Sequence, residues 1–170
     1  MLGLEKGVVR VVPYDPDWQV QYALEAARLQ ACIGALVLDI QHVSSTAVPG
    51  CDAKPIIDIA ISIADLGKVE ACVPPLEGLG YEYKGENGIP GRHYFQRGKP
   101  VCLFHIHMST QDHSNWINHL RFRNFLLAHP EAVQAYCQLK HDLAARYTND
   151  RLAYTEGKAE FIRSILEAAK

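Results

Sequence analysis

The sequence predicts an α+β protein, with a small mixed sheet in the first two thirds of the chain and a helical C-terminal third. Residues 55–63, PIIDIAISI, alternate between apolar residues and small or polar ones, which is the period of a β-strand. From Asp112 onward, apolar residues recur every three or four positions, the period of helices that bury one face. We therefore expect a mixed β-sheet flanked by helices, in a single domain over residues 1–170.

The composition of the 170 residues is ordinary for a globular protein, with 48% hydrophobic and 21% charged residues and a formal net charge of −2. Without an overall basic charge, duplex nucleic acid is not an expected partner. No membrane contact is expected either, because no segment approaches the ~20 apolar residues of a membrane span. The five cysteines form no CxxC pair, which favours a reducing, cytoplasmic setting over a disulfide framework.

The N-terminal part predicts a strand followed by a helix. Residues 8–12 are rich in β-branched side chains and are ended by Pro13, which is typical of an edge strand. Asp15-Pro16-Asp17 predicts a helix start, because a capping carboxylate precedes a proline at the first helical position. This helix is expected to end at Gly34 and to bury residues at helical spacing, namely Tyr22, Ala26, Leu29 and Ile33.

Two strands should surround the loop of residues 44–53. Residues 36–43 predict the first strand, and Pro49-Gly50 and the hydroxyl residues before it predict a turn and loop. The second strand covers residues 55–63, with four isoleucines on one face and Asp58 in the middle of the other.

The middle of the chain predicts a short helix and three more strands. Asp65 is the expected cap of a helix that Pro74-Pro75 would end by Leu76. Residues 78–83 and 93–97 predict strands around a polar loop, and Gly98-Lys99 predicts a hairpin turn into a strand over residues 101–108.

The last third predicts three helices. The first should stop before Pro130, which is expected to open the second. Asn149 or Thr155 is the expected cap of the last helix, which buries residues at helical spacing: Ile162, Ile165, Leu166 and Ala169.

The hydroxyl turn, residues Ser44, Ser45 and Thr46, is a candidate phosphate site. A turn that leaves a strand exposes backbone N–H groups, and hydroxyl side chains add donors. Lys54 follows eight residues after Thr46 and could neutralise a phosphate. The alternative interpretation is a solvated turn without a ligand.

Asp58, His105 and His107 are the candidate metal ligands. A carboxylate in mid-strand needs a partner if it is buried, either an ion pair or a divalent cation. His105 and His107 alternate on one strand and so project side by side, a spacing that suits a metal such as Zn or Mn, although hydrogen-bond anchoring is the alternative. His42 is interpreted as structural. Basic residues elsewhere could bring a phosphate contact to the same site: Arg92, Arg121, Arg123, Lys140 and Lys158.

The run HVSSTAVPGCDAKPIIDIAI resembles the HxGSTxVPGLxAKPIIDI signature of the GrpB family, with Cys51 in place of the usual leucine. The resemblance extends almost end to end, through VVPYDPDWQ, GYEY, GIPGRHYF, FHIHM, LRFRNFL, LKHDLA and YTEGKAEFI. It implies a nucleotidyltransferase-like fold, and it implies a link to dephospho-CoA kinase, because GrpB-like domains also occur fused to that enzyme.

The wider nucleotidyltransferase superfamily implies a catalytic site that this chain matches only in part. Its Gly-Ser turn corresponds to Ser44-Ser45, and its first catalytic carboxylate corresponds to Asp58. Its second carboxylate would fall at Ala60, and its third near His105 or His107. Two-metal phosphoryl transfer needs several anionic oxygens, so the missing carboxylates make a standard pair of Mg²⁺ ions unexpected.

Three functions are therefore compatible with the sequence. The leading hypothesis is a protein that binds a nucleotide or another phosphorylated small molecule. It would perform nucleotidyl transfer through catalytic Asp58 and a divalent metal (Mg, Mn or Zn). The second is a non-catalytic accessory or folding module linked to dephospho-CoA kinase. The third is a histidine-based metal hydrolase. The sequence leaves the substrate, the metal and the oligomeric state open.

Overall fold

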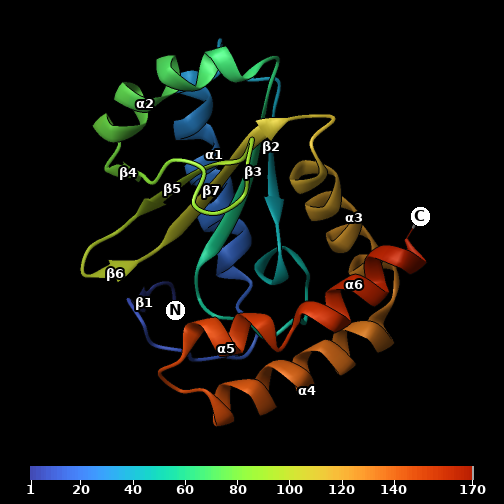
Figure 1. Cartoon of the computed structure of the whole chain (residues 1–170). Helices are drawn as coiled ribbons and strands as arrows, with labels where there is room; N and C mark the ends of the chain where they lie inside the picture. The colour runs from blue at the N-terminus through green and yellow to red at the C-terminus, as the bar shows by residue number, and fades with distance from the viewer. Residues whose placement is uncertain (170) are drawn as a thin grey trace.

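The protein is represented by a computed structural model that describes residues 1–169 (Figure 1). A five-stranded sheet has the order β2-β3-β7-β5-β4. Strands β3 and β7 pair in parallel, and the other neighbouring pairs are antiparallel. With helices on both faces, this mixed sheet confirms the predicted α+β class. Its strands are Asp39–Val43 (β2), Ile57–Ile63 (β3), Tyr81–Tyr83 (β4), His93–Arg97 (β5) and Phe104–Thr110 (β7).

The isoleucine face of β3 forms the main core. Its four isoleucines, at positions 57, 59, 61 and 63, are fully buried together with Phe95, Ile106 and Met108 of the neighbouring strands. Helices α1 (Asp17–Ile33) and α2 (Val69–Gly78) cover this face. The predicted start of α1 is confirmed closely, since Asp15 Oδ1 accepts a hydrogen bond from the Asp17 N–H at 3.0 Å.

The prediction that Pro74 and Pro75 end the second helix is wrong. A 3₁₀ turn, Leu66–Lys68, precedes α2, and Asp65 caps that turn rather than α2 by accepting from the Gly67 N–H. Helix α2 then runs through both prolines to Gly78. Its buried residues Cys72 and Leu76 pack against the sheet, and this packing offsets the backbone hydrogen bonds that the prolines remove.

The predicted strand over residues 8–12 is also wrong. Val9 packs instead against Leu143 and Tyr154 of the helical third, and Val12 makes an isolated bridge to Ala53. The strand near this end is β1 (Leu4–Glu5), which pairs with β6 (Val101–Cys102) in a separate two-stranded sheet.

The opposite face of the sheet carries the helical third. Helix α3 (Ser114–Ala128) packs on the sheet, while α4 (Pro130–Arg146), α5 (Arg151–Glu156) and α6 (Ala159–Ala168) gather at its lower end (Figure 1). Pro130 separates α3 from α4 as predicted. The predicted cap of the last helix is wrong, because α6 begins after Lys158 without a side-chain cap. The preceding short helix α5 is capped by Asp150, whose carboxylate accepts from the Ala153 N–H. Within residues 1–169, no helix combines the length and apolar character needed to cross a bilayer.

A buried ion pair fastens α1 to the sheet. Glu25 is 2% exposed and accepts hydrogen bonds from Arg97 of β5 at 2.6 and 2.7 Å and from the Tyr81 hydroxyl of β4 at 2.8 Å. Arg28 adds a contact at 3.0 Å from a side chain that is 46% exposed. Glu25 lies on the buried face of α1, at helical spacing from the apolar residues Trp18 and Leu29, so this face contains a charged residue among apolar ones.

Glu25→Ala should lower the free energy of unfolding by about 3–5 kcal/mol, because it leaves the Arg97 charge without its partner. Urea denaturation followed by circular dichroism measures this loss. Arg28→Ala is the matched control, since it removes an exposed contact and should cost less than about 1 kcal/mol. Equal losses for the two variants would contradict the assignment.

Candidate active-site cavity

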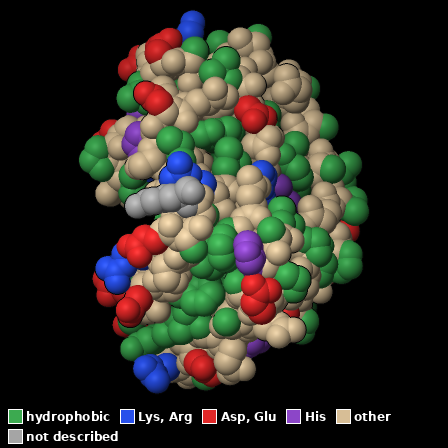
Figure 2. All heavy atoms as spheres, turned by 90° about the vertical axis from the view of Figure 1, so that its right-hand side faces the viewer, with side chains coloured by type: hydrophobic (Ala, Val, Ile, Leu, Met, Phe, Trp, Pro, Cys, Tyr) green, Lys and Arg blue, Asp and Glu red, His purple; other side chains and the backbone are tan. Residues whose placement is uncertain are grey.

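A cavity of about 670 Å³ lies on the α3 side of the sheet. Its floor comes from β3, β5 and β7, and its walls come from the hydroxyl turn and helices α3 to α6. On the outer face drawn in Figure 2, acidic and basic side chains are interspersed. The cavity wall differs, because it brings together five basic residues and one carboxylate: Lys54, Arg92, Lys140, Arg151, Lys158 and Asp58.

The hydroxyl turn lines this cavity, as a phosphate site requires. Ser45–Ala47 form a single 3₁₀ turn after β2, and Ser45 Oγ accepts a hydrogen bond from Lys140 Nζ at 3.0 Å. Thr46 Oγ1 lies 3.0 Å from His42 Nε2. Burial lowers the pKa of His42 to about 4, so this histidine is neutral and supports the turn.

Ser44 occupies a backbone conformation that favours glycine. Its φ of 63° and ψ of −166° fall in a region that residues with a side chain adopt only at a cost. The GrpB signature has glycine at this position. The strain therefore sits at the point where the chain leaves β2 and enters the cavity wall.

Parallel pairing of β3 with β7 brings the predicted metal ligands together. Asp58 is registered with His105, and Asp58 Oδ1 lies 3.2 Å from His105 Nδ1 and 2.9 Å from His107 Nε2. Burial opposes ionisation of Asp58, but the hydrogen bonds from both histidines outweigh it and hold its pKa well below the usual range. Burial lowers the pKa of His105, which favours its neutral form.

The hydrogen bonds around His107 define its tautomer. Arg92 Nη1 donates to His107 Nδ1 at 3.2 Å, so His107 is neutral there and carries its proton on Nε2, facing Asp58. Arg92 is itself buried and donates to the backbone carbonyls of Glu86 and Asn87. Arg92 thus connects the loop before β5 to the histidine pair.

The cluster of Asp58, His105 and His107 fits a divalent metal. One ligand atom from each residue lies within 4.8 Å of the others. His105 Nε2 is buried without a hydrogen-bond partner among the described residues, so its lone pair could be given to a metal. Two imidazoles and one carboxylate suit Zn, Mn or Fe better than Mg, which prefers oxygen ligands.

Ala60, where the resemblance described above implies a second carboxylate, is buried. It is 1% exposed and packs with Val43 of β2 and Trp116 of α3. Trp116 therefore covers the space that a second metal ligand would need.

The basic residues of the cavity have no acidic partners. Among residues 1–169, no carboxylate lies within 4.0 Å of the five cations. Lys54 and Lys158 both face the Tyr154 ring, at 5.3 and 4.5 Å from its centre. Burial, with Arg151 nearby, lowers the pKa of Lys54 to about 8, and burial together with Lys54 and Lys140 lowers that of Lys158 to about 7.

The structure brings most of the predicted site residues to one cavity. All of them line it except Arg121 and Arg123 of α3, of which Arg121 is exposed. Arg121 immediately precedes the buried Phe122 and so points away from the packed face. Arg123 also lies outside the cavity lining and donates to Gln41 Oε1 and to the His42 carbonyl.

The residues of the cavity that sequence reasoning missed include a histidine, His119, and a basic residue, Arg151. The His119 ring lies 4.6 Å from that of His107, and burial lowers the pKa of His119 to about 3. The available signal was helical spacing, because four α3 residues at spacings of three and four line the cavity: Asn115, Asn118, His119 and Phe122. No local pattern marks Arg151.

Together these features define an α+β protein whose mixed sheet supports a cavity with a histidine–carboxylate cluster and a basic wall. The chain belongs to the GrpB family, since the family model for GrpB protein matches residues 8–168. Glutamate-rich protein GrpB of Alkalihalophilus pseudofirmus is 35% identical, over 98% of this chain and 98% of that protein. The crystal structure of conserved protein GrpB from Enterococcus faecalis has a TM-score of 0.88 at 35% identity, covering 94% of this chain and 96% of that one.

Other relatives are longer than this chain. A UPF0157 protein of Pseudomonas aeruginosa is 40% identical over 95% of the chain, which spans 67% of that protein. The chain spans 48% of the UPF0157 protein YqkA of Bacillus subtilis, at 37% identity. It also spans 47% of a dephospho-CoA kinase of Mycolicibacterium paratuberculosis, at 29% identity. A remote likeness to Cid1, solved with the UTP analogue UMPNPP, has 11% identity and a TM-score of 0.45, covering 86% of this chain and 46% of that one.

Ser44→Gly should raise the free energy of unfolding by about 1 kcal/mol. Removal of the backbone strain stabilises the folded state by about 1–3 kcal/mol, and the greater conformational freedom of glycine in the unfolded chain offsets part of this gain. Thermal and urea unfolding measure the change. Ser45→Gly is the matched control, because it removes the acceptor of Lys140 and should be destabilising; stabilisation by both variants would contradict the strain at Ser44.

Proposed function

We propose that the cavity binds a nucleotide or another phosphorylated small molecule, with its phosphate groups against the hydroxyl turn and the lysines. The observation that carries this proposal is the charge of the wall: five cations line one cavity with a single carboxylate, and that carboxylate is already engaged by two histidines. Buried cations without acidic partners are costly, and a bound polyanion offsets that cost.

The individual roles follow from the contacts. The ammonium groups of Lys54 and Lys158 lie against the Tyr154 ring, and within residues 1–169 neither forms an ion pair. Both groups are therefore available to an anion. Lys140 holds Ser45 in place and adds its charge from below the turn. Aromatic and aliphatic residues of the cavity wall supply an apolar surface for the rest of the ligand: Phe122, Tyr136, Ile162 and Leu166.

Asp58, His105 and His107 would hold a divalent metal beside this anion. A metal bound there supplies Lewis-acid polarisation of a phosphoryl oxygen. Arg92 keeps His107 oriented toward Asp58, and Trp116 over Ala60 keeps a second carboxylate out. Nucleotidyl transfer in this site would therefore depend on one metal and on the basic wall, rather than on a pair of Mg²⁺ ions.

A metal-dependent phosphohydrolase is the second candidate function, favoured by the two imidazoles in the ligand set. A non-catalytic module that assists a dephospho-CoA kinase is the third. It is supported by the kinase in which a related segment makes up about half of the protein.

Isothermal titration with nucleoside triphosphates and dephospho-CoA, each with and without Mn²⁺ or Zn²⁺, tests the proposal. The Lys54→Ala/Asp58→Ala double variant should bind at least about 100-fold more weakly, since it removes one charged contact of ~1.5–3 kcal/mol and one metal ligand. Arg121→Ala is the matched control, because Arg121 carries the same charge outside the cavity. Equal affinity of the double variant and the wild type would overturn the site.

Turnover distinguishes the three functions. Pyrophosphate release from a nucleoside triphosphate supports transfer, and orthophosphate release restored by Zn²⁺ or Mn²⁺ supports hydrolysis. If ligand binds without either reaction, but the activity of an added dephospho-CoA kinase rises, the accessory role is supported.

Anion binding should weaken as the pH rises from 6 to 9. Lys158 and Lys54 have pKa values of about 7 and about 8 in the free protein, so both are charged at pH 6 and both are largely neutral at pH 9. An anion binds the charged forms, so the dissociation constant should rise about tenfold per pH unit above each pKa. Sulfate is a suitable probe, because its own charge is constant over this range.

Lys158→Met should remove the part of this pH dependence that is centred near pH 7 and leave the part near pH 8. Arg121→Ala should keep the full profile. A sulfate affinity that does not change with pH in the wild type would contradict the role given to the two lysines.

A further inference from the structure

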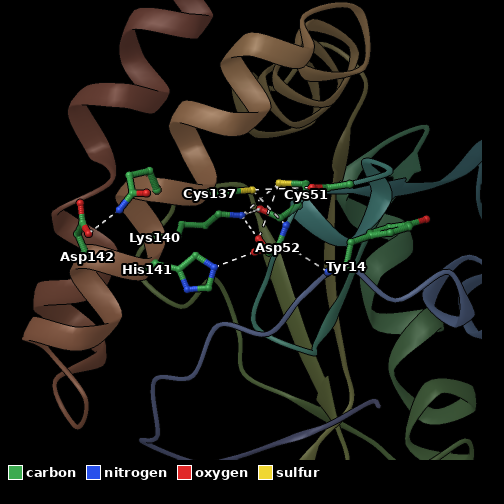
Figure 3. A network of polar contacts seen from close by, with 10 residues as sticks. Tyr14, Cys51, Asp52, Cys137, Lys140, His141 and Asp142 are labelled. Carbon is green, nitrogen blue, oxygen red and sulfur yellow. Dashed lines mark hydrogen bonds and ion pairs between the residues drawn. The ribbon is translucent and has the colours of Figure 1, made fainter.

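One face of helix α4 contacts the loop that follows the hydroxyl turn (Figure 3). Cys137, Lys140 and His141, spaced by three and four residues, all contact Cys51 or Asp52 of this loop. His141 Nε2 lies 2.8 Å from the Asp52 carboxylate. The loop therefore depends on α4 for its position against the cavity.

Two thiols lie at the centre of this contact. Figure 3 shows the side chains of Cys51 and Cys137 extending toward each other from the loop and from α4, and both sulfurs contact the backbone of Asp52. The Asp52 N–H donates to Cys137 Sγ at 3.2 Å, and Lys140 Nζ donates to Cys51 Sγ at 3.2 Å. None of the proposed chemistry of the cavity uses either sulfur.

We propose that Cys51 and Cys137 form an oxidisable dithiol, with hydrogen peroxide or a related hydroperoxide as its reactant. The Cys137 thiolate attacks one peroxide oxygen, the O–O bond breaks, and Cys137 becomes a sulfenic acid while water leaves. The Cys51 sulfur then attacks the Cys137 sulfur, the S–OH bond breaks, and a second water leaves with the Cys51 proton. The two thiols lose two electrons, and the peroxide is reduced to two water molecules.

The difference in burial between the thiols sets the order of attack. Cys51 is fully buried, whereas Cys137 is half-buried and so is the sulfur that a small oxidant reaches first. The Lys140 ammonium group lies 3.2 Å from Cys51 Sγ, so a positive charge stands beside the sulfur that attacks second. Burial raises the pKa of Cys137, so the first step is slow at neutral pH and accelerates as the pH rises.

Disulfide formation changes the anion site through Lys140. This lysine donates to Cys51 Sγ, to Ser45 Oγ and to the Asp52 carbonyl, so the reduced loop positions its ammonium group below the hydroxyl turn. A disulfide would draw Cys51 toward α4, and Lys140 would lose the Cys51 thiol as a hydrogen-bond acceptor. We expect the oxidised chain to bind anions about tenfold more weakly, from the loss of one charged hydrogen bond. This last expectation rests on the proposed function.

The full-length chain treated with hydrogen peroxide tests the proposal directly. Before alkylation, the intact mass of the treated protein should be about 2 Da lower, because two hydrogens are lost. After denaturation and alkylation, two fewer cysteines should carry the alkyl group. Non-reducing peptide mapping should find Cys51 joined to Cys137, and dithiothreitol should reverse the link. Cys32, Cys72 and Cys102 should remain alkylated.

Cys137→Ser should abolish the cross-link, and Cys102→Ser, another half-buried cysteine, should leave it unchanged. Sulfinic acid on Cys137 without a link to Cys51, or a link between other cysteines, would overturn the proposal. This measurement uses the wild-type chain alone, so the test does not depend on the folding of either variant.

Sulfate titration of the reduced and oxidised chain then measures the coupling. Weaker binding after oxidation that dithiothreitol restores supports it, and equal binding overturns the coupling. If neither form binds sulfate but the Cys51–Cys137 link forms, the proposed function fails while the dithiol stands.

Discussion

The parallel pairing of β3 with β7 is the constraint on which the site depends. A parallel register aligns residues on the same face of neighbouring strands, so Asp58 meets His105 and His107 without any loop being involved. The opposite face of the same strand carries the isoleucine core, and a slip of one residue would exchange the two faces. The burial of that core therefore also fixes the position of the carboxylate. The core residues and the candidate metal ligand Asp58 lie on opposite faces of β3, so a change of register would displace both.

Charge gives the cavity its second property. Lys54, Lys140 and Lys158 come from the loop before β3, from α4 and from the start of α6, and their mutual repulsion works against closure of the helical third on the sheet. The Tyr154 and Tyr136 rings partly compensate, since each lies against one or two ammonium groups. The cavity wall thus keeps a positive charge that the two rings offset only in part.

The sequence predicted those parts of the fold that short-range patterns control. Alternation placed Asp58 on the polar face of β3, and Pro130 separated α3 from α4, because in both cases the signal lies within a few residues. The prediction failed where tertiary packing overrides local preference: Pro74 and Pro75 lie inside α2 because neighbouring residues are buried in the core. Glu25 and Arg151 could not be found at all, since each owes its role to segments far away in the chain. A polar helix face also does not indicate which of its arginines points toward the cavity, and Arg121 proved to point away from it.

Trp116 and Val43 pack against Ala60, so the face of β3 beside Asp58 has no room for a larger side chain at position 60. An aspartate at position 60 would be buried against an indole ring and a valine, which is costly for a charged group. A smaller residue at position 116 on its own would open a void and weaken the contact between α3 and the sheet. Each step toward a two-carboxylate centre is harmful without the other. A second carboxylate on this strand face would therefore require coupled changes at positions 60 and 116 rather than a single substitution.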